Sequence, residues 1–134
     1  MTPSEALREA AFDAMENAYA PYSQFKVGAA VRTSTGEVIT GCNVENAAYG
    51  EALCAERVAV AAAVAMGFRG FEEIAIASDS ADPSPPCGSC RQTMSEFAPD
   101  LKVTSYARNG KSAVWRLGDL LPEAFALNHL RGRS

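Results

Sequence analysis

Three cysteines and one glutamate stand in two short motifs whose residue types can do chemistry. Cys54-Ala55-Glu56 places a carboxyl two residues after a thiol, and Pro86-Cys87-Gly88-Ser89-Cys90 places two thiols three residues apart. Three thiolates can hold Zn²⁺ and leave its fourth tetrahedral position open, as in catalytic rather than structural sites. Water bound at an open position ionises near neutral pH, and a nearby carboxylate can take its proton. We therefore predict that Cys54, Cys87 and Cys90 bind zinc and that Glu56 transfers the proton.

Two helix starts must position these motifs. A helix is predicted over Gly88–Phe97, directly after Pro86-Cys87, and proline is common where helices begin. Cys87 and Cys90 therefore lie on one side of its first turn. Cys54 lies near the start of a second predicted helix, over residues 51–66. Free amides and the positive end of the dipole stabilise thiolates at both starts, so the two helices can face one metal ion.

Other interpretations of these residues remain open. Glu56 alone can be a helix cap or a salt-bridge partner, and Cys87 with Cys90 can be a redox pair, which leaves Cys54 unexplained. Cys42 can be a fourth ligand of a structural zinc site, although we favour a small buried apolar role for it. The only histidine, His129, lies in neither motif. The site is therefore built from three cysteines, or it recruits a carboxylate.

Two arginines directly follow the motifs. Three thiolates outweigh the charge of Zn²⁺ and make bound water less acidic, so a compensating positive charge is needed. Arg57 follows Glu56, and Arg91 follows Cys90. We predict that both arginines donate hydrogen bonds to the thiolates.

The remaining pattern alternates strands with helices. Thr2, Pro3 and Glu5 fit the start of a helix that keeps one apolar face as far as Ala18. Strands are predicted over residues 25–32, 38–44, 74–78, 101–107 and 114–117, the first two joined by a turn at 34–36. An apolar segment over residues 120–127 follows them. This order predicts an α/β fold with helices on both faces of a central sheet.

Composition limits the class of protein. With 134 residues and 48% hydrophobic side chains, we expect one domain, residues 1–134, with its own core. Twelve basic against 16 acidic side chains give a net charge of −4, which argues against a nucleic-acid partner. We find no signal-peptide pattern, and the longest apolar run, residues 58–66, is too short to span a bilayer. We expect a cytoplasmic protein with no membrane partner.

At the two motifs the chain resembles the cytidine deaminase family. The signature of zinc deaminases is a His or Cys, then x-Glu, then Pro-Cys-x-x-Cys, and this chain carries the all-cysteine form. The resemblance covers roughly residues 5–127 and includes the segments at 22–30, 41–47 and 120–125. It points to the small, homotetrameric nucleoside deaminases. It implies a three-layer α/β/α sandwich with a central mixed five-stranded sheet.

The resemblance also implies a reaction and the residues that serve it. The reaction is zinc-dependent hydrolysis of free cytidine and 2′-deoxycytidine to uridine and 2′-deoxyuridine, with release of ammonia, in pyrimidine salvage. Glu56 moves a proton to N3 of the base and then to the leaving amino group. The implied substrate contacts are Asn43 and Glu45 to the ribose, Phe25 to the pyrimidine face, backbone groups at Ala47 and Ala55 to the base edge, and Tyr49 and Phe125 across subunit boundaries. For Phe25, ordinary strand core is the competing interpretation.

Three alternative functions remain. Deaminases of nucleoside antibiotics such as blasticidin S share the cysteine motifs but differ where the sugar is read, and Asn43-Val44-Glu45-Asn46 favours a ribose. A non-catalytic zinc-binding domain would not need Glu56. Editing of RNA or DNA is disfavoured by the acidic charge balance.

Overall fold

A computed structural model describes residues 1–127 and is built on one five-stranded sheet. Its strands are β1 (Val27–Thr33), β2 (Val38–Cys42), β3 (Phe71–Ser78), β4 (Lys102–Ala107) and β5 (Ser112–Arg116), in the order β2-β1-β3-β4-β5. β3 and β4 run parallel, and the other neighbouring pairs are antiparallel. The predicted mixed sheet is confirmed.

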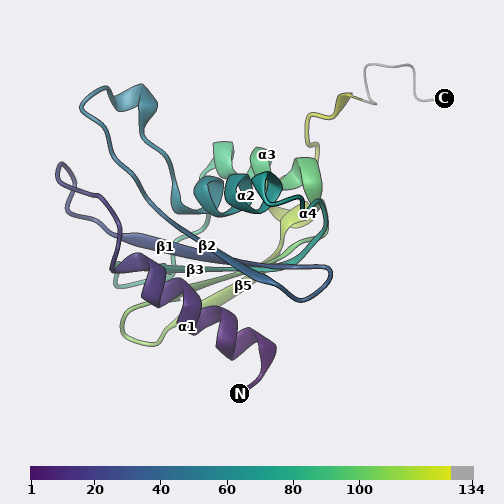
Figure 1. Ribbon diagram of the computed structural model, residues 1–134, viewed down its shortest axis with the longest axis horizontal. Coiled ribbons are helices and arrows are strands. Elements are labelled where there is room, and N and C mark those ends of the chain that lie inside the picture. The colour runs from purple at the N-terminus through teal and green to yellow at the C-terminus, as the bar shows by residue number, and fades with distance from the viewer. Residues whose placement is uncertain (128–134) are drawn as a thin grey trace.

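Helices cover both faces of this sheet. The helix α1 (Pro3–Met15) lies on one face, and α2 (Ala55–Ala65), α3 (Gly88–Phe97) and the short α4 (Leu117–Leu120) lie on the other (Figure 1). This confirms the predicted three-layer α/β/α arrangement. The bounds of α3 are those predicted from the sequence.

The start of α1 is fixed by the predicted capping box. The Thr2 side chain accepts a hydrogen bond from the amide of Glu5, and the Glu5 carboxylate accepts one from the amide of Thr2. The helix ends at Met15, earlier than predicted, because Tyr19 pairs its backbone with Asn43 instead of continuing the helix. α1 therefore leads directly into a loop that runs beside residues 43–45.

Other element boundaries also differ from the prediction, and two of the differences have a clear structural reason. β3 begins at Phe71, three residues early, because the buried Glu73 carboxylate is neutralised by Arg32 at 3.1 Å and fits inside a strand. The predicted helix over 51–66 begins only at Ala55. A 3₁₀ helix over Tyr49–Glu51 precedes it, and Leu53 then pairs its backbone with Val44. This pairing leaves Cys54 at the residue directly before α2.

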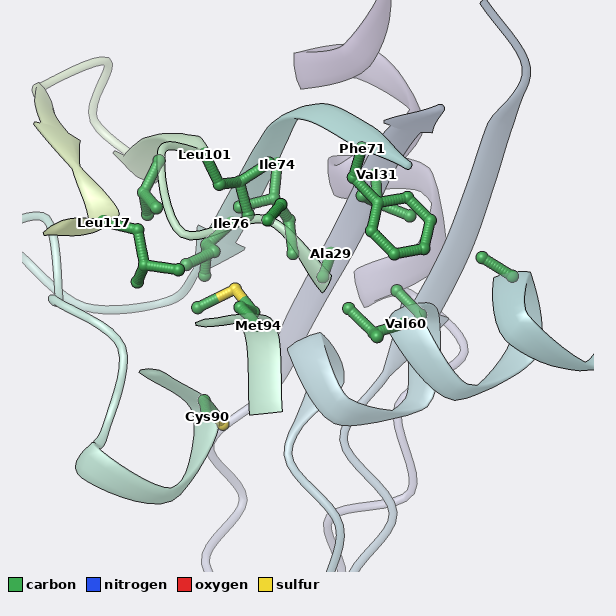
Figure 2. Close-up of a cluster of buried hydrophobic side chains, with 14 of the residues drawn as sticks. Ala29, Val31, Val60, Phe71, Ile74, Ile76, Cys90, Met94, Leu101 and Leu117 are labelled. Atoms are coloured by element: carbon green, nitrogen blue, oxygen red, sulfur yellow. The ribbon is translucent and has the colours of Figure 1, made fainter. Parts of the chain in front are cut away.

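The larger core cluster lies between the sheet and the α2–α3 layer. Ile74 and Ile76 from β3 pack there with Val60 from α2 and Met94 from α3. Figure 2 shows Cys90 at one end of this cluster, with Met94 between it and the strand side chains. Burial of Met94 therefore fixes the helix turn that carries Cys90.

Over residues 1–127, none of the helices combines the length and the apolar character that a membrane crossing requires.

Candidate metal centre and active site

The three predicted cysteines converge at the two helix starts. Cys54 is the N-cap of α2, Cys87 is the N-cap of α3, and Cys90 lies in the first turn of α3. The Sγ atom of Cys87 lies 3.8 Å from that of Cys54 and 3.3 Å from that of Cys90. Tetrahedral Zn–S bonds of about 2.3 Å separate two sulfurs by about 3.8 Å. The cluster therefore fits a zinc ion, and Cys42 is not part of it.

The pKa values of two thiols in this cluster are shifted in opposite directions. Hydrogen bonding to Cys90 and to Cys87, together with the charge of Arg57, lowers the pKa of Cys54 to about 6. The contact with Cys54, burial and the Glu56 carboxylate raise the pKa of Cys90. The side chains of Cys54 and Cys87 accept no hydrogen bond from the first amides of the helices that they precede. The first amides of α2 and α3 therefore need other partners. Thiolates are the form that binds zinc, so metal binding releases the remaining thiol protons.

Glu56 lies in the first turn of α2 with only 6% of its surface exposed. Burial is the main cause that raises its pKa to about 7, and the charge of Cys54 adds to the effect. A carboxyl that ionises near neutral pH can both accept and return a proton. Among residues 1–127 the candidate metal-binding cluster consists of cysteines alone.

A cavity of about 330 Å³ opens beside the cysteines and Glu56. This volume suits a small molecule. Ser78 at the end of β3 and Ser84 in the following loop add hydroxyl groups that the sequence analysis did not single out. The predicted site residues that line the cavity are Phe25, Asn43, Glu45, Cys54, Ala55, Glu56 and Cys87.

Asn43 is held by the backbone at the start of β1. Its Oδ1 accepts from the amide of Val27, and its Nδ2 donates to the carbonyl of Phe25, both at 2.9 Å. One amide hydrogen and one lone pair remain for another partner. Phe25 precedes β1, is 37% exposed and lines the cavity, so the strand-core interpretation of this residue is wrong.

Three predicted substrate contacts lie away from this cavity within the single chain. Ala47 is exposed, Tyr49 is 82% exposed and Phe125 is 64% exposed. Tyr49 instead lines an adjoining pocket, which also contains Glu45. The backbone of Phe125 is held against α3 by a hydrogen bond from Gln92.

The two arginines behave differently from the prediction. Arg91 donates to the carbonyl oxygens of Pro86 and Leu120, at 2.8 and 2.9 Å. Arg57 acts on Cys54 through its charge, and its nearest hydrogen-bond partner is the Ser89 hydroxyl at 3.5 Å. Neither arginine therefore donates a hydrogen bond to a cysteine sulfur, and this prediction is wrong. Because Arg91 donates to the main-chain carbonyl of Pro86, it holds the backbone directly before Cys87.

Removal of one sulfur tests the metal centre. We expect Cys87→Ala to lose the single zinc ion per chain, because two thiolates bind the metal far more weakly than three. Metal analysis of protein purified without chelator measures the zinc content. Cys42→Ala removes a half-buried thiol outside the cluster and is the matched control, which should retain full zinc. Equal zinc in both variants would contradict the proposed ligand set.

Comparison with known proteins agrees with this geometry. The family model described as "Cytidine and deoxycytidylate deaminase zinc-binding region" matches residues 1–106. A cytidine deaminase of Halalkalibacterium halodurans is 45% identical over 90% of this chain and 92% of its own length. The crystal structure of a cytidine deaminase from Burkholderia pseudomallei is 52% identical, with a TM-score of 0.89, and covers 93% of this chain and 100% of its own.

A blasticidin-S deaminase of Bacillus cereus is a more distant relative, 36% identical over 76% of this chain and 78% of its own length. The resemblance inferred from the cysteine motifs is confirmed, and it extends over the fold as well as the metal centre. The chain belongs to the cytidine and deoxycytidylate deaminase family.

Proposed function

We propose that this chain catalyses hydrolytic deamination of free cytidine and 2′-deoxycytidine to the corresponding uridines, with release of ammonia. One observation carries the proposal: in a chain of this family, a small-molecule cavity has in its wall two cysteines of the metal-binding cluster, Cys54 and Cys87, and a buried carboxyl, Glu56. Such a cavity excludes bulk water around the group that transfers the proton.

Cys54, Cys87 and Cys90 would hold zinc, which would act as a Lewis acid and lower the pKa of a bound water molecule. Glu56 takes a proton from the attacking water and delivers it to N3 of the pyrimidine. The water oxygen adds to C4 as a hydroxyl, and Glu56 then takes the remaining proton from that hydroxyl and transfers it to the departing amino group. The C4–N4 bond breaks and ammonia leaves, so one carboxyl acts first as base and then as acid.

The other cavity residues orient the nucleoside. The Phe25 ring packs on the pyrimidine face, and backbone groups at Ala55 bind the base edge. Ala47, which lies outside the cavity of the single chain, is the second backbone group proposed for the base edge. The free amide hydrogen of Asn43 and the Glu45 carboxylate bind the ribose hydroxyls, since both side chains line the cavity. A polar pair at the sugar end favours a free nucleoside over blasticidin S.

We further propose that residues 1–134 form one domain and assemble as a cytoplasmic homotetramer that serves pyrimidine salvage. Tyr49 and Phe125 are large side chains left exposed by the single chain, and Leu53 is 41% exposed beside the cavity. Contiguous exposed apolar patches mark protein interfaces, and these side chains would contribute to such a patch in an assembly. Tyr49 and Phe125 would complete the site of a neighbouring subunit, and native mass spectrometry counts the subunits. The net charge of −4 gives no support to a nucleic-acid partner.

The decisive experiment incubates the zinc-replete protein with cytidine and follows the loss of cytosine absorbance together with the release of ammonia. We expect one ammonia for each cytidine lost and a rate that is abolished by chelation and restored by zinc. Blasticidin S serves as the competing substrate. Absence of turnover with both cytidine and deoxycytidine, or faster turnover of blasticidin S, would overturn the proposal.

A further inference from the structure

The sugar end of the cavity contains a carboxylate that is already held in place. Glu45 Oε1 accepts hydrogen bonds from the amides of Tyr22 and Ser23, at 3.0 and 3.1 Å. Glu45 Oε2 accepts from the Ser23 hydroxyl. A carboxylate has about four acceptor sites, so these three bonds leave about one for a further donor.

The Ser23 hydroxyl also holds the residue expected to pack on the base. Its oxygen accepts from the amide of Phe25 at 3.0 Å while its hydrogen is donated to Glu45. Phe25 and Glu45 both line the cavity, whereas Ser23 does not. One hydroxyl therefore connects two cavity residues that are 20 positions apart in the sequence.

The backbone around Ser23 adopts a conformation that needs support. Gln24 has a φ of 58°, the left-handed region, which is costly for a residue other than glycine. Its amide donates to the carbonyl of Ala20, and the neighbouring Tyr19 is paired with residues 43–45. Strained conformations of this kind persist where the surroundings impose them, and they concentrate at functional sites.

From these contacts we infer that Ser23 is a positioning residue for ribose recognition: its hydroxyl holds the Glu45 carboxylate so that one acceptor site is left for a sugar hydroxyl. The inference rests on the proposed function, because it names what fixes a residue of that same site. The bonds to Ser23 and Tyr22 also lower the pKa of Glu45, which keeps the acceptor ionised.

The test compares cytidine with 2′,3′-dideoxycytidine, which lacks the 2′- and 3′-hydroxyls and keeps the 5′-hydroxyl. We expect Ser23→Ala to raise KM for cytidine about fivefold, the equivalent of one hydrogen bond, and to leave kcat nearly unchanged. For dideoxycytidine the KM should stay within about twofold of wild type. Ser23→Thr retains the hydroxyl and should restore the KM for cytidine. In a Glu45→Gln background, Ser23→Ala should have no further effect on the preference for cytidine.

A matched control removes a similar contact far from the cavity. The Thr35 hydroxyl donates to the Glu37 carboxylate in the β1–β2 turn, so Thr35→Ala deletes an exposed hydroxyl–carboxylate bond without changing either KM. If Ser23→Ala leaves the cytidine preference unchanged, or impairs both substrates equally, the inference is wrong while the deaminase proposal stands. A wild-type protein that turns over neither substrate would overturn both.

Discussion

Glu56→Gln should lower kcat for cytidine deamination by about 10²- to 10⁴-fold, the usual contribution of a positioned proton-transfer group. The amide keeps the size of the side chain but cannot carry a proton between water, N3 and the leaving amino group. Burial raises the pKa of Glu56 to about 7, which suits a group that both accepts and returns a proton. The same burial keeps buffer molecules from reaching the site and replacing this carboxyl. Steady-state absorbance measurements with saturating cytidine give the change in kcat.

Zinc content and thermal unfolding should be unchanged in this variant, since Glu56 lies outside the cysteine cluster. Glu9→Gln makes the same substitution at an exposed position on α1, which lies on the opposite face of the sheet from α2 (Figure 1), and should keep full activity. A Glu56→Gln variant that retains more than about a tenth of the wild-type kcat would show that another group transfers the proton.

Gly28→Ala should destabilise the protein by about 3 kcal/mol, the upper end of the usual cost of overpacking. α1 crosses β1 so closely at Gly28 that a Cβ atom would lie 2.0 Å from the carbonyl oxygen of Ala11 and 2.5 Å from the amide nitrogen of Met15. Both neighbours are backbone atoms, so no side-chain rotation relieves the overlap and α1 must move off the sheet. Thermal unfolding should shift down by about 10 °C.

Gly50→Ala is the control for this substitution. A Cβ atom at Gly50 meets no heavy atom within 4 Å, so its free energy of unfolding should change by less than about 0.5 kcal/mol. Equal unfolding midpoints for the two variants would mean that α1 does not pack on β1 as closely as the structure shows.

Local sequence was enough to predict the starts of α3 and α1. Pro86 before Cys87 marks the start of α3, and the Thr2–Glu5 capping box marks the start of α1, because both signals act within one helical turn. The start of β3 cannot be predicted from local sequence, since Glu73 interrupts the apolar pattern and only its contact with Arg32, in another strand, makes its burial acceptable.

The contacts at the substrate end of the cavity are also only partly predictable from the sequence. Asn43 and Glu45 were recognised from a motif, but their bonds to the loop before β1 depend on how that loop folds back. The contribution of Ser23 has no signal of its own in the sequence, because a serine in a polar turn is ordinary. Arg91 was placed beside the thiolates by proximity in sequence, whereas the fold directs it to two backbone carbonyls.

The sequence by itself determined the kind of site: three thiols and one carboxyl, at helix starts, in a spacing typical of zinc deaminases. Only the tertiary structure decided that Cys54 and Cys87, 33 residues apart, bring their sulfurs to 3.8 Å and that Glu56 is buried beside them. The physical reason is that spacing acts within a helical turn, whereas packing of α2 and α3 on one face of the sheet sets the distances between turns.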